Sequence, residues 1–203
     1  RGHGLHSAAG VSAAHPPSLT RALFAEALGT GLLVATVVGS GIMAQRLSSD
    51  LGLQLLVNTL PTAAILIVLI SVLGPISGGH FNPAGSLVFA ARRELPWAAF
   101  AAYVPCQLAG GALGTLLAHA MFDLSLLQLS ILLRSGPSQW LAEAVATFGL
   151  LLTILGGRRY RPKAVPALVG LYIGGAYWFT ASTSFANPAV TLARTLTDAF
   201  AGI

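Results

Sequence analysis

The chain alternates between long apolar stretches and short polar segments. Five stretches have the length of membrane-crossing helices, which need about 20 apolar residues; they cover residues 22–44, 51–73, 96–121, 139–155 and 164–180. A polar loop at residues 45–50 separates the first two, and a longer loop is expected over residues 122–137. The pattern therefore predicts an all-α protein with five membrane-spanning helices.

Two further apolar stretches, residues 81–91 and 185–196, are much shorter. At about 1.5 Å per residue each would form a helix of about 15 Å, roughly half of a 30 Å hydrocarbon core. The backbone of such a half-span is tolerated only where protein or a water-filled cavity surrounds it. Two half-spans in corresponding places point to a solute pathway.

The composition agrees with a lipid environment. Apolar residues make up 55% of the chain and charged residues 8%, whereas soluble domains carry about a quarter charged residues. A soluble fold could not cover its surface with so few charges, so the lipid bilayer is expected to be the main solvent. The 203 residues have the size of one membrane domain. The single cysteine, Cys106, excludes an internal disulfide and a cysteine metal cluster, and we expect no metal or cofactor.

The net charge of +5 could suggest nucleic acid, but the positions of the basic residues have a better explanation. With the N-terminus in the cytoplasm and each half-span returning to the side it entered from, the basic residues favour the inner side, the expected bias. The inner segments then hold Arg1, Arg21, Arg92, Arg93, Arg158, Arg159, Arg161 and Lys163, and the outer segments hold Arg46, Arg134 and Arg194. No nucleic-acid partner is needed.

The two halves of the chain repeat each other. The segment FAEALGT around Glu26 matches LAEAVAT around Glu143, and Asn-Pro-Ala occurs at residues 82–84 and again at 187–189. Because the two glutamates are three spans apart, an odd number, the second copy is inserted upside down relative to the first. The two half-spans can then meet from opposite faces near the middle of the bilayer.

The repeated motif starts helices and carries chemistry. Asn is a favoured N-cap and Pro a favoured first helical residue, so Asn82 and Asn187 should each cap a half-helix and leave a side-chain NH₂ to donate into a pore. The helix N-termini carry partial positive charge. Aimed at one point, they repel cations and orient a passing water. We expect conduction of neutral molecules and exclusion of protons through six motif residues: Asn82, Pro83, Ala84, Asn187, Pro188 and Ala189.

At these residues the chain resembles the aquaporin and aquaglyceroporin family, also called major intrinsic proteins. Residues 175–180 (GAYWFT) and 184–190 (SFANPAV) are similar to a bacterial branch associated with arsenic-resistance genes. The resemblance implies an aquaporin-like inverted repeat, a homotetramer and an inner-membrane location. It divides the chain into a flexible extension over residues 1–18 and a channel domain over 19–203, with repeat 1 at about 19–121 and a truncated repeat 2 at about 138–203.

The resemblance also implies residues that hold the re-entrant loops. In the family, a glutamate early in the first and fourth spans supports these loops from behind, and Glu26 and Glu143 match. A carboxylate inside a membrane needs partners, and the loop backbone N–H groups are the natural ones. His80 precedes the first motif, where the family usually has a histidine; we interpret it as a packing and hydrogen-bonding residue.

The narrowest filter of the family uses four positions, usually including an aromatic residue and an arginine. Carried over by spacing, they fall on Thr62, Gly175, Ser184 and Val190. All four side chains are small or medium, which predicts a wider filter without its fixed charge and leaves cation exclusion mainly to the helix ends. Larger neutral solutes such as glycerol, urea or undissociated arsenous acid are expected beside water. A water-selective pore is the alternative.

Family members have a sixth span after the second half-helix, whereas this sequence stops at Ile203. The resemblance therefore implies a pore with one side exposed to lipid. Two other classes of function compete with a channel. A secondary transporter also uses inverted repeats but would carry intramembrane charges beyond Glu26 and Glu143, and a non-conducting scaffold would have a plugged filter. An enzyme is not expected, since no catalytic pair stands out.

Overall fold

The computed structural model describes residues 18–203. Residues 1–17 of the extension expected at residues 1–18 therefore lie outside the described residues. The rest forms helices and connecting loops, with no strand in the described part. The helices are α1 (Leu19–Leu47), α2 (Leu51–Ser77), α3 (Pro83–Ala91), α4 (Trp97–Met121), α5 (Pro137–Tyr160), α6 (Val165–Phe179) and α7 (Pro188–Arg194), with a 3₁₀ turn (Pro162–Ala164) before α6.

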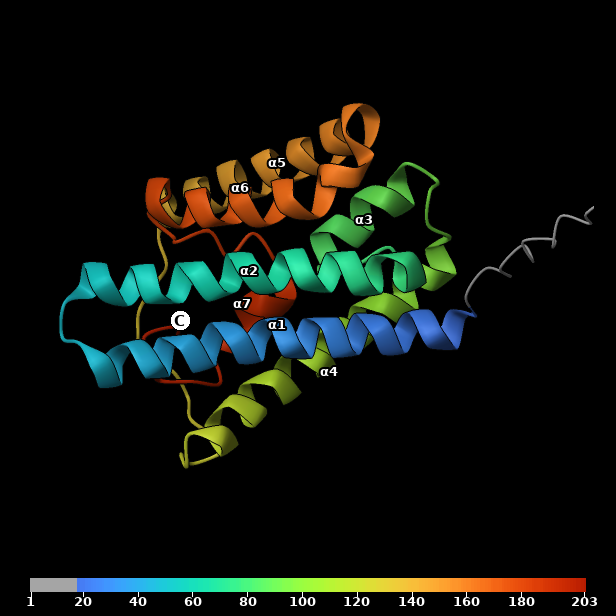
Figure 1. The fold of residues 1–203 in the computed structure, drawn as a ribbon. Coiled ribbons are helices and arrows are strands. Elements are labelled where there is room, and N and C mark those ends of the chain that lie inside the picture. Colours follow the sequence, from blue (N-terminus) through green and yellow to red (C-terminus); the bar gives the residue numbers. More distant parts are fainter. Residues whose placement is uncertain (1–17) are drawn as a thin grey trace, which may run out of the picture.

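The helices form one bundle, in which α1 lies between α2 and α4 (Figure 1). Helix α1 packs against α2 and α4, helix α2 also packs against α6, and α6 packs against α5. The short helices α3 and α7 both contact α4 and meet each other inside the bundle. The interior is therefore reached by two helices that do not cross it.

Four helices, α1, α2, α4 and α5, are long and apolar enough to cross a membrane. The fifth predicted span is also helical, but α6 has only 15 residues, fewer than the usual 20 or so. Pro166 lies in its first turn, where the N–H that proline lacks has no partner within the helix, and so favours a helix start at Val165. The 3₁₀ turn before it lengthens this segment.

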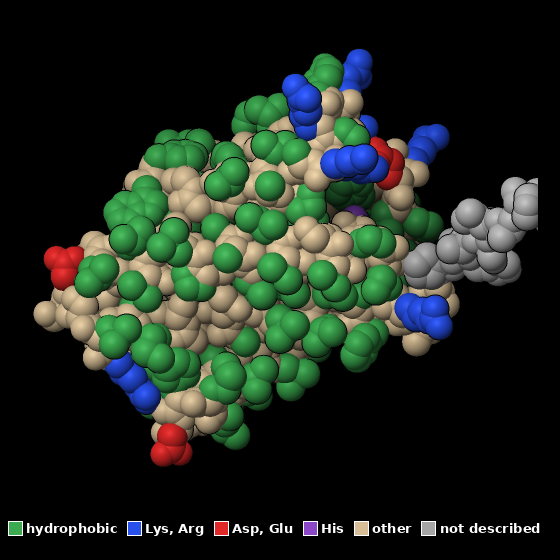
Figure 2. All heavy atoms as spheres, in the orientation of Figure 1, with side chains coloured by type: hydrophobic (Ala, Val, Ile, Leu, Met, Phe, Trp, Pro, Cys, Tyr) green, Lys and Arg blue, Asp and Glu red, His purple; other side chains and the backbone are tan. Residues whose placement is uncertain are grey.

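The outside of the bundle is suited to lipid. The most apolar window of α1 is 61% buried inside the protein, whereas that of α5 is only 17% buried. Large apolar side chains such as Phe24, Leu133 and Leu171 are exposed. Figure 2 shows hydrophobic side chains along the flanks and charged side chains at the two ends. Such an apolar surface is not stable in water, so lipid must cover it.

Glycines let α1 and α4 approach very closely. A Cβ atom added to Gly110 would lie 2.1 Å from the carbonyl oxygen of Ala27, and one added to Gly114 would lie 2.2 Å from that of Gly31. Neither carbonyl can yield without moving a helix. This is the small-residue contact that holds helices together in membranes, and it fixes the distance of α4 from the centre of the bundle.

Replacing Gly110 with Ala should therefore destabilise the protein by about 1–3 kcal/mol, the usual cost of overpacking. Thermal unfolding in detergent measures the loss. Gly156→Ala in α5 is the matched control, because its added Cβ would meet nothing within 4 Å. Equal melting temperatures for the two variants would contradict this packing.

Candidate functional site

Both half-helices begin at the asparagine of an Asn-Pro-Ala motif. The side-chain oxygen of Asn82 accepts hydrogen bonds from the backbone N–H groups of Ala84 (2.9 Å) and Gly85 (3.4 Å). In α7 the oxygen of Asn187 accepts in the same way from Ala189 (3.0 Å) and Val190 (3.3 Å). Each proline follows directly as the first helical residue. Local sequence thus sets both helix starts.

The two asparagines also hold each other's loops. The Nδ2 atom of Asn82 donates to the carbonyl oxygen of Ala186, and that of Asn187 donates to the carbonyl of Phe81, both at 2.7 Å. Phe81 and Ala186 have left-handed φ angles of 48° and 46°, so the same turn precedes each motif. The sequence predicted that each side-chain NH₂ group would be free to donate hydrogen bonds into a pore. In the structure one of its two N–H bonds is used between the loops, and the other remains.

Two glutamates support these loops from behind in the same way. Glu26 accepts hydrogen bonds from the backbone N–H groups of His80 (3.0 Å) and Phe81 (2.6 Å). Glu143 accepts from those of Phe185 (2.9 Å) and Ala186 (2.7 Å). Each carboxylate therefore binds the two N–H groups that directly precede an Asn-Pro-Ala motif. Hydrogen-bond donors of this kind stabilise a carboxylate that is buried within the membrane.

Glu26 has two further partners that the sequence did not identify. Its carboxylate also accepts from the Ser77 hydroxyl (2.6 Å) and from the Gln107 amide (2.7 Å). The same amide nitrogen of Gln107 lies 3.0 Å from the hydroxyl of Ser86 in α3. A glutamine inside an apolar span was the available signal for this role. Gln107 thus connects α4 both to the first loop and to the first half-helix.

His80 is held on three sides. Its Nδ1 atom lies 3.0 Å from the hydroxyl oxygen of Ser86. Its ring stacks on Phe89, with centroids 4.7 Å apart, and meets the edge of Tyr103 at 5.6 Å. These contacts join the first loop to α3 and α4.

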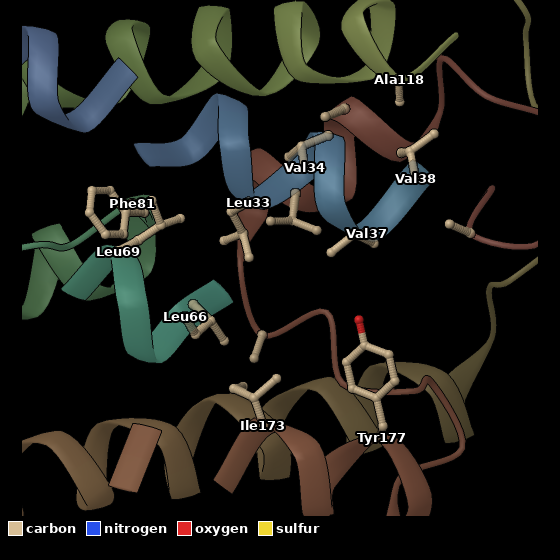
Figure 3. Close-up of a cluster of buried hydrophobic side chains, with 14 of the residues drawn as sticks. Leu33, Val34, Val37, Val38, Leu66, Leu69, Phe81, Ala118, Ile173 and Tyr177 are labelled. Carbon is tan, nitrogen blue, oxygen red and sulfur yellow. The ribbon is translucent and has the colours of Figure 1, made fainter. Parts of the chain in front are cut away.

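A cavity of about 120 Å³ lies inside the bundle and is lined by both asparagines. This volume is enough for several water molecules. Arg158, at the end of α5, and Arg194, at the end of α7, both line it. Most of the remaining wall is apolar and comes from α1, α2, α5 and α6 (Figure 3). The two capped helix ends thus face a passage with few other polar groups.

Three of the four expected filter residues, Thr62, Ser184 and Val190, line this cavity, and Gly175 does not. Gly175 is exposed and shares a face of α6 with the exposed Leu171 and Trp178. In a helix, residues four apart share a face and a residue two positions along points away. The face of α6 that lines the cavity therefore carries Ile173 and Tyr177 instead.

Tyr177 places an aromatic ring where spacing from the motif suggested a glycine. Its side chain is buried, and its hydroxyl donates to the Thr62 hydroxyl oxygen at 3.4 Å. Figure 3 shows Tyr177 and Ile173 pointing from α6 into the interior, toward Val37 and Leu66. This end of the cavity is consequently narrower and more polar on the α6 side than the sequence suggested.

Arg158, on the cavity wall at the end of α5, belongs to a cluster of charged groups. The guanidinium of Arg158 lies 2.6 Å from the Glu94 carboxylate and 4.7 Å from the centroid of the Phe89 ring. Arg92 binds the other carboxylate oxygen of Glu94 at 2.7 Å. The hydrogen bond from Arg92, with further help from Arg158, lowers the pKa of Glu94 below its ordinary value. Glu94 thus joins the loop after α3 to the end of α5.

The sequence pattern of the major intrinsic protein family matches residues 13–202. The chain belongs to the major intrinsic protein family. This confirms the resemblance that was based on the repeated Asn-Pro-Ala motif.

The relatives of this major intrinsic protein are channels named for water and glycerol. It is 63% identical over 185 residues to aquaglyceroporin AqpS from Rhizobium meliloti (strain 1021), a match that covers 91% of this chain and 79% of that protein. It is 30% identical to aquaporin NIP2-1 from Oryza sativa subsp. japonica, covering 89% of this chain and 62% of the relative. The chain therefore spans less than two thirds of the rice protein.

A solved structure has the same fold. The X-ray structure of the aquaglyceroporin from Plasmodium falciparum matches with a TM-score of 0.69 at 22% identity, covering 87% of this chain and 79% of that one. The predicted all-α membrane fold is therefore confirmed.

Replacing Glu26 with Gln should destabilise this protein more than replacing Glu143 with Gln. Glu26 accepts from four groups, Glu143 from two. Glutamine has one acceptor oxygen and turns an NH₂ group toward donors, and each donor left unpaired costs about 1–3 kcal/mol. Thermal unfolding of the two variants in detergent tests this order. An equal loss, or a larger one for Glu143→Gln, would contradict the assignment.

Proposed function

We propose that this chain forms a passive pore for small uncharged solutes and water. The observation that carries the proposal is the meeting of two Asn-capped half-helices at one cavity, with each asparagine donating to the opposite loop. The names of its relatives, aquaglyceroporin and aquaporin, support the same class. The family consists of channels, so the expectation that the chain is not an enzyme is confirmed.

The geometry suggests how neutral molecules pass and cations do not. The remaining amide N–H bonds of Asn82 and Asn187 can donate to the oxygen of a passing water or hydroxyl group. The N-termini of α3 and α7 add partial positive charge at the same place. A water whose oxygen faces both amides turns its hydrogens outward and cannot relay a proton along a chain. Cations meet positive potential between apolar walls and are repelled.

Passive transport fits the few charges inside the bundle. The carboxylates of Glu26 and Glu143 both accept hydrogen bonds from loop N–H groups. Neither is left as an ion-binding or proton-carrying group, which a coupled transporter requires. The secondary transporter is therefore not favoured.

The filter residues favour solutes larger than water. The third residue after Asn187 is Val190, a small apolar side chain on the cavity wall where an arginine was expected from the family. With Ser184 and Thr62 this leaves room for glycerol-sized molecules, while Tyr177 limits the opening on one side. Glycerol, urea and undissociated arsenous acid are the proposed solutes, the last because of the branch that the sequence resembles. The alternative, a water-selective pore, is not favoured, because the relative at 63% identity is named an aquaglyceroporin.

Orientation and assembly are also proposals. Figure 2 shows Lys and Arg gathered at the end of the molecule where α1 begins. The positive-inside rule then places the N-terminus in the cytoplasm, and we place the protein in the inner membrane. A homotetramer follows from likeness to the family.

Replacing Val190 with Arg should reduce glycerol and urea flux more than water flux, because the longer side chain narrows the filter for the larger solutes. A loss of about tenfold in glycerol flux corresponds to about 1.4 kcal/mol of added barrier. Stopped-flow light scattering on proteoliposomes measures all three fluxes. Val190→Leu, which adds little volume and no charge, is the control. Equal reduction for every solute would contradict this filter.

A further inference from the structure

Arg194 is a buried arginine that the sequence placed in an outer polar segment. It is the last residue of α7 and only 2% exposed, yet it lines the cavity. It follows Val190 by four residues. Four residues make about one helical turn, so the two side chains share a face of α7 about 6 Å apart along its axis. The chain thus carries an arginine on the cavity wall one turn beyond the position where it lacks one.

The structure holds this guanidinium in place through one edge and one face. Its Nε atom donates to the carbonyl oxygen of Ala201, and its Cζ atom lies 4.2 Å from the centroid of the Phe185 ring. The Arg194 carbonyl in turn accepts from the N–H of Ile203 at 3.3 Å. The side chain is therefore fixed without using its two terminal nitrogens.

Within the described residues Arg194 makes no ion pair; the Glu143 carboxylate attracts its charge and Arg134 repels it only from a distance. Within residues 18–203, the ion pairs within 4.0 Å involve only Glu94 with Arg92 and Arg158. The terminal nitrogens of Arg194 have no hydrogen-bond acceptor in the same described part. An arginine in low dielectric without a counter-ion projects a strong positive potential into the space beside it. Here that space is the cavity.

A second polar group lies on the same cavity without a partner. The hydroxyl oxygen of Ser184 is buried and has no hydrogen-bond partner within the described residues. Ser184 and Tyr177 both line the cavity with Arg194. Buried hydroxyls are normally paired, so this one is available to a passing solute. The end of the cavity beyond the asparagines therefore offers a fixed cation and the unpaired hydroxyl of Ser184.

We infer that Arg194 supplies the fixed positive charge of the filter that is absent at Val190, and that it excludes inorganic cations and protons together with the two half-helix ends. The inference rests on the proposed pore. Because the arginine lies one helical turn beyond Val190, the width of the filter and its positive charge are set by different residues. Val190 leaves the filter wide for neutral solutes, while Arg194 keeps the same passage positive. Cation exclusion thus does not depend on the half-helix ends alone.

The test compares cation leak with solute flux in proteoliposomes. Arg194→Met removes the charge and keeps an unbranched side chain, Arg194→Gln also retains a donor for Ala201, and Arg194→Lys keeps the charge. Sodium and proton entry are followed with ion-sensitive dyes trapped inside the vesicles, and glycerol flux with light scattering. Arg46→Met is the matched control, because Arg46 lies at the end of α1 and donates to the Phe122 carbonyl instead of lining the cavity.

Both neutral variants should lower the barrier to cations and so raise sodium or proton entry by about tenfold or more. Glycerol should still pass. Arg194→Lys and Arg46→Met should retain exclusion. Cation entry equal to the parent channel in Arg194→Gln or Arg194→Met, with glycerol flux intact, would overturn the role of Arg194. Absence of solute flux in the parent channel would instead overturn the proposed pore. If Arg194→Met does not fold, Arg194→Gln decides.

Discussion

The structure depends on one reciprocal contact, in which each asparagine of the repeated motif donates to the carbonyl that precedes the other asparagine. A helix that ends in the middle of a membrane leaves N–H groups that lipid cannot satisfy. Here the Asn side chains satisfy the first N–H groups of their own helices. The same side chains then hold the opposite loop. Two half-helices that would each be unstable alone become one continuous element across the bilayer.

The surrounding helices serve this contact. Glu26 and Glu143 fix the two N–H groups before each motif, and the left-handed turns at Phe81 and Ala186 direct the carbonyls across. Glycines in α4 bring it against α1, close to both short helices. The result is a cavity with donors at its centre, apolar walls and a cation at each end, Arg158 and Arg194. Shape and charge are set by different residues, so a wide passage can remain positive.

The elements that the sequence predicted well are those that local chemistry decides. Asn and Pro are favoured at a helix start, so both half-helices were predicted with their caps at Asn82 and Asn187, where the structure has them. The long spans followed from apolar length. The end of α7 was placed two residues too late, since Leu196 already turns back to Ala193.

What the sequence missed depends on rotation and distance between helices. Motif spacing cannot show that α6 turns Tyr177 and not Gly175 toward the cavity. It also cannot tell a charged residue in an outer loop from one on a cavity wall, which is why Arg194 was counted as an outer charge. A glutamine in an apolar span signals a buried polar role for Gln107, but its partner Glu26 is known only once α4 is placed beside α1.

The most direct measurement of the central claim is the ratio of proton to water flux in the Asn82→Asp, Asn187→Asp double variant, reconstituted in vesicles. Aspartate caps helices as well as asparagine, so both helix starts should survive, but two negative groups would then replace the two amide donors. The account predicts that protons or sodium ions enter while water still passes. Unchanged exclusion of both ions, with water flux retained, would contradict it.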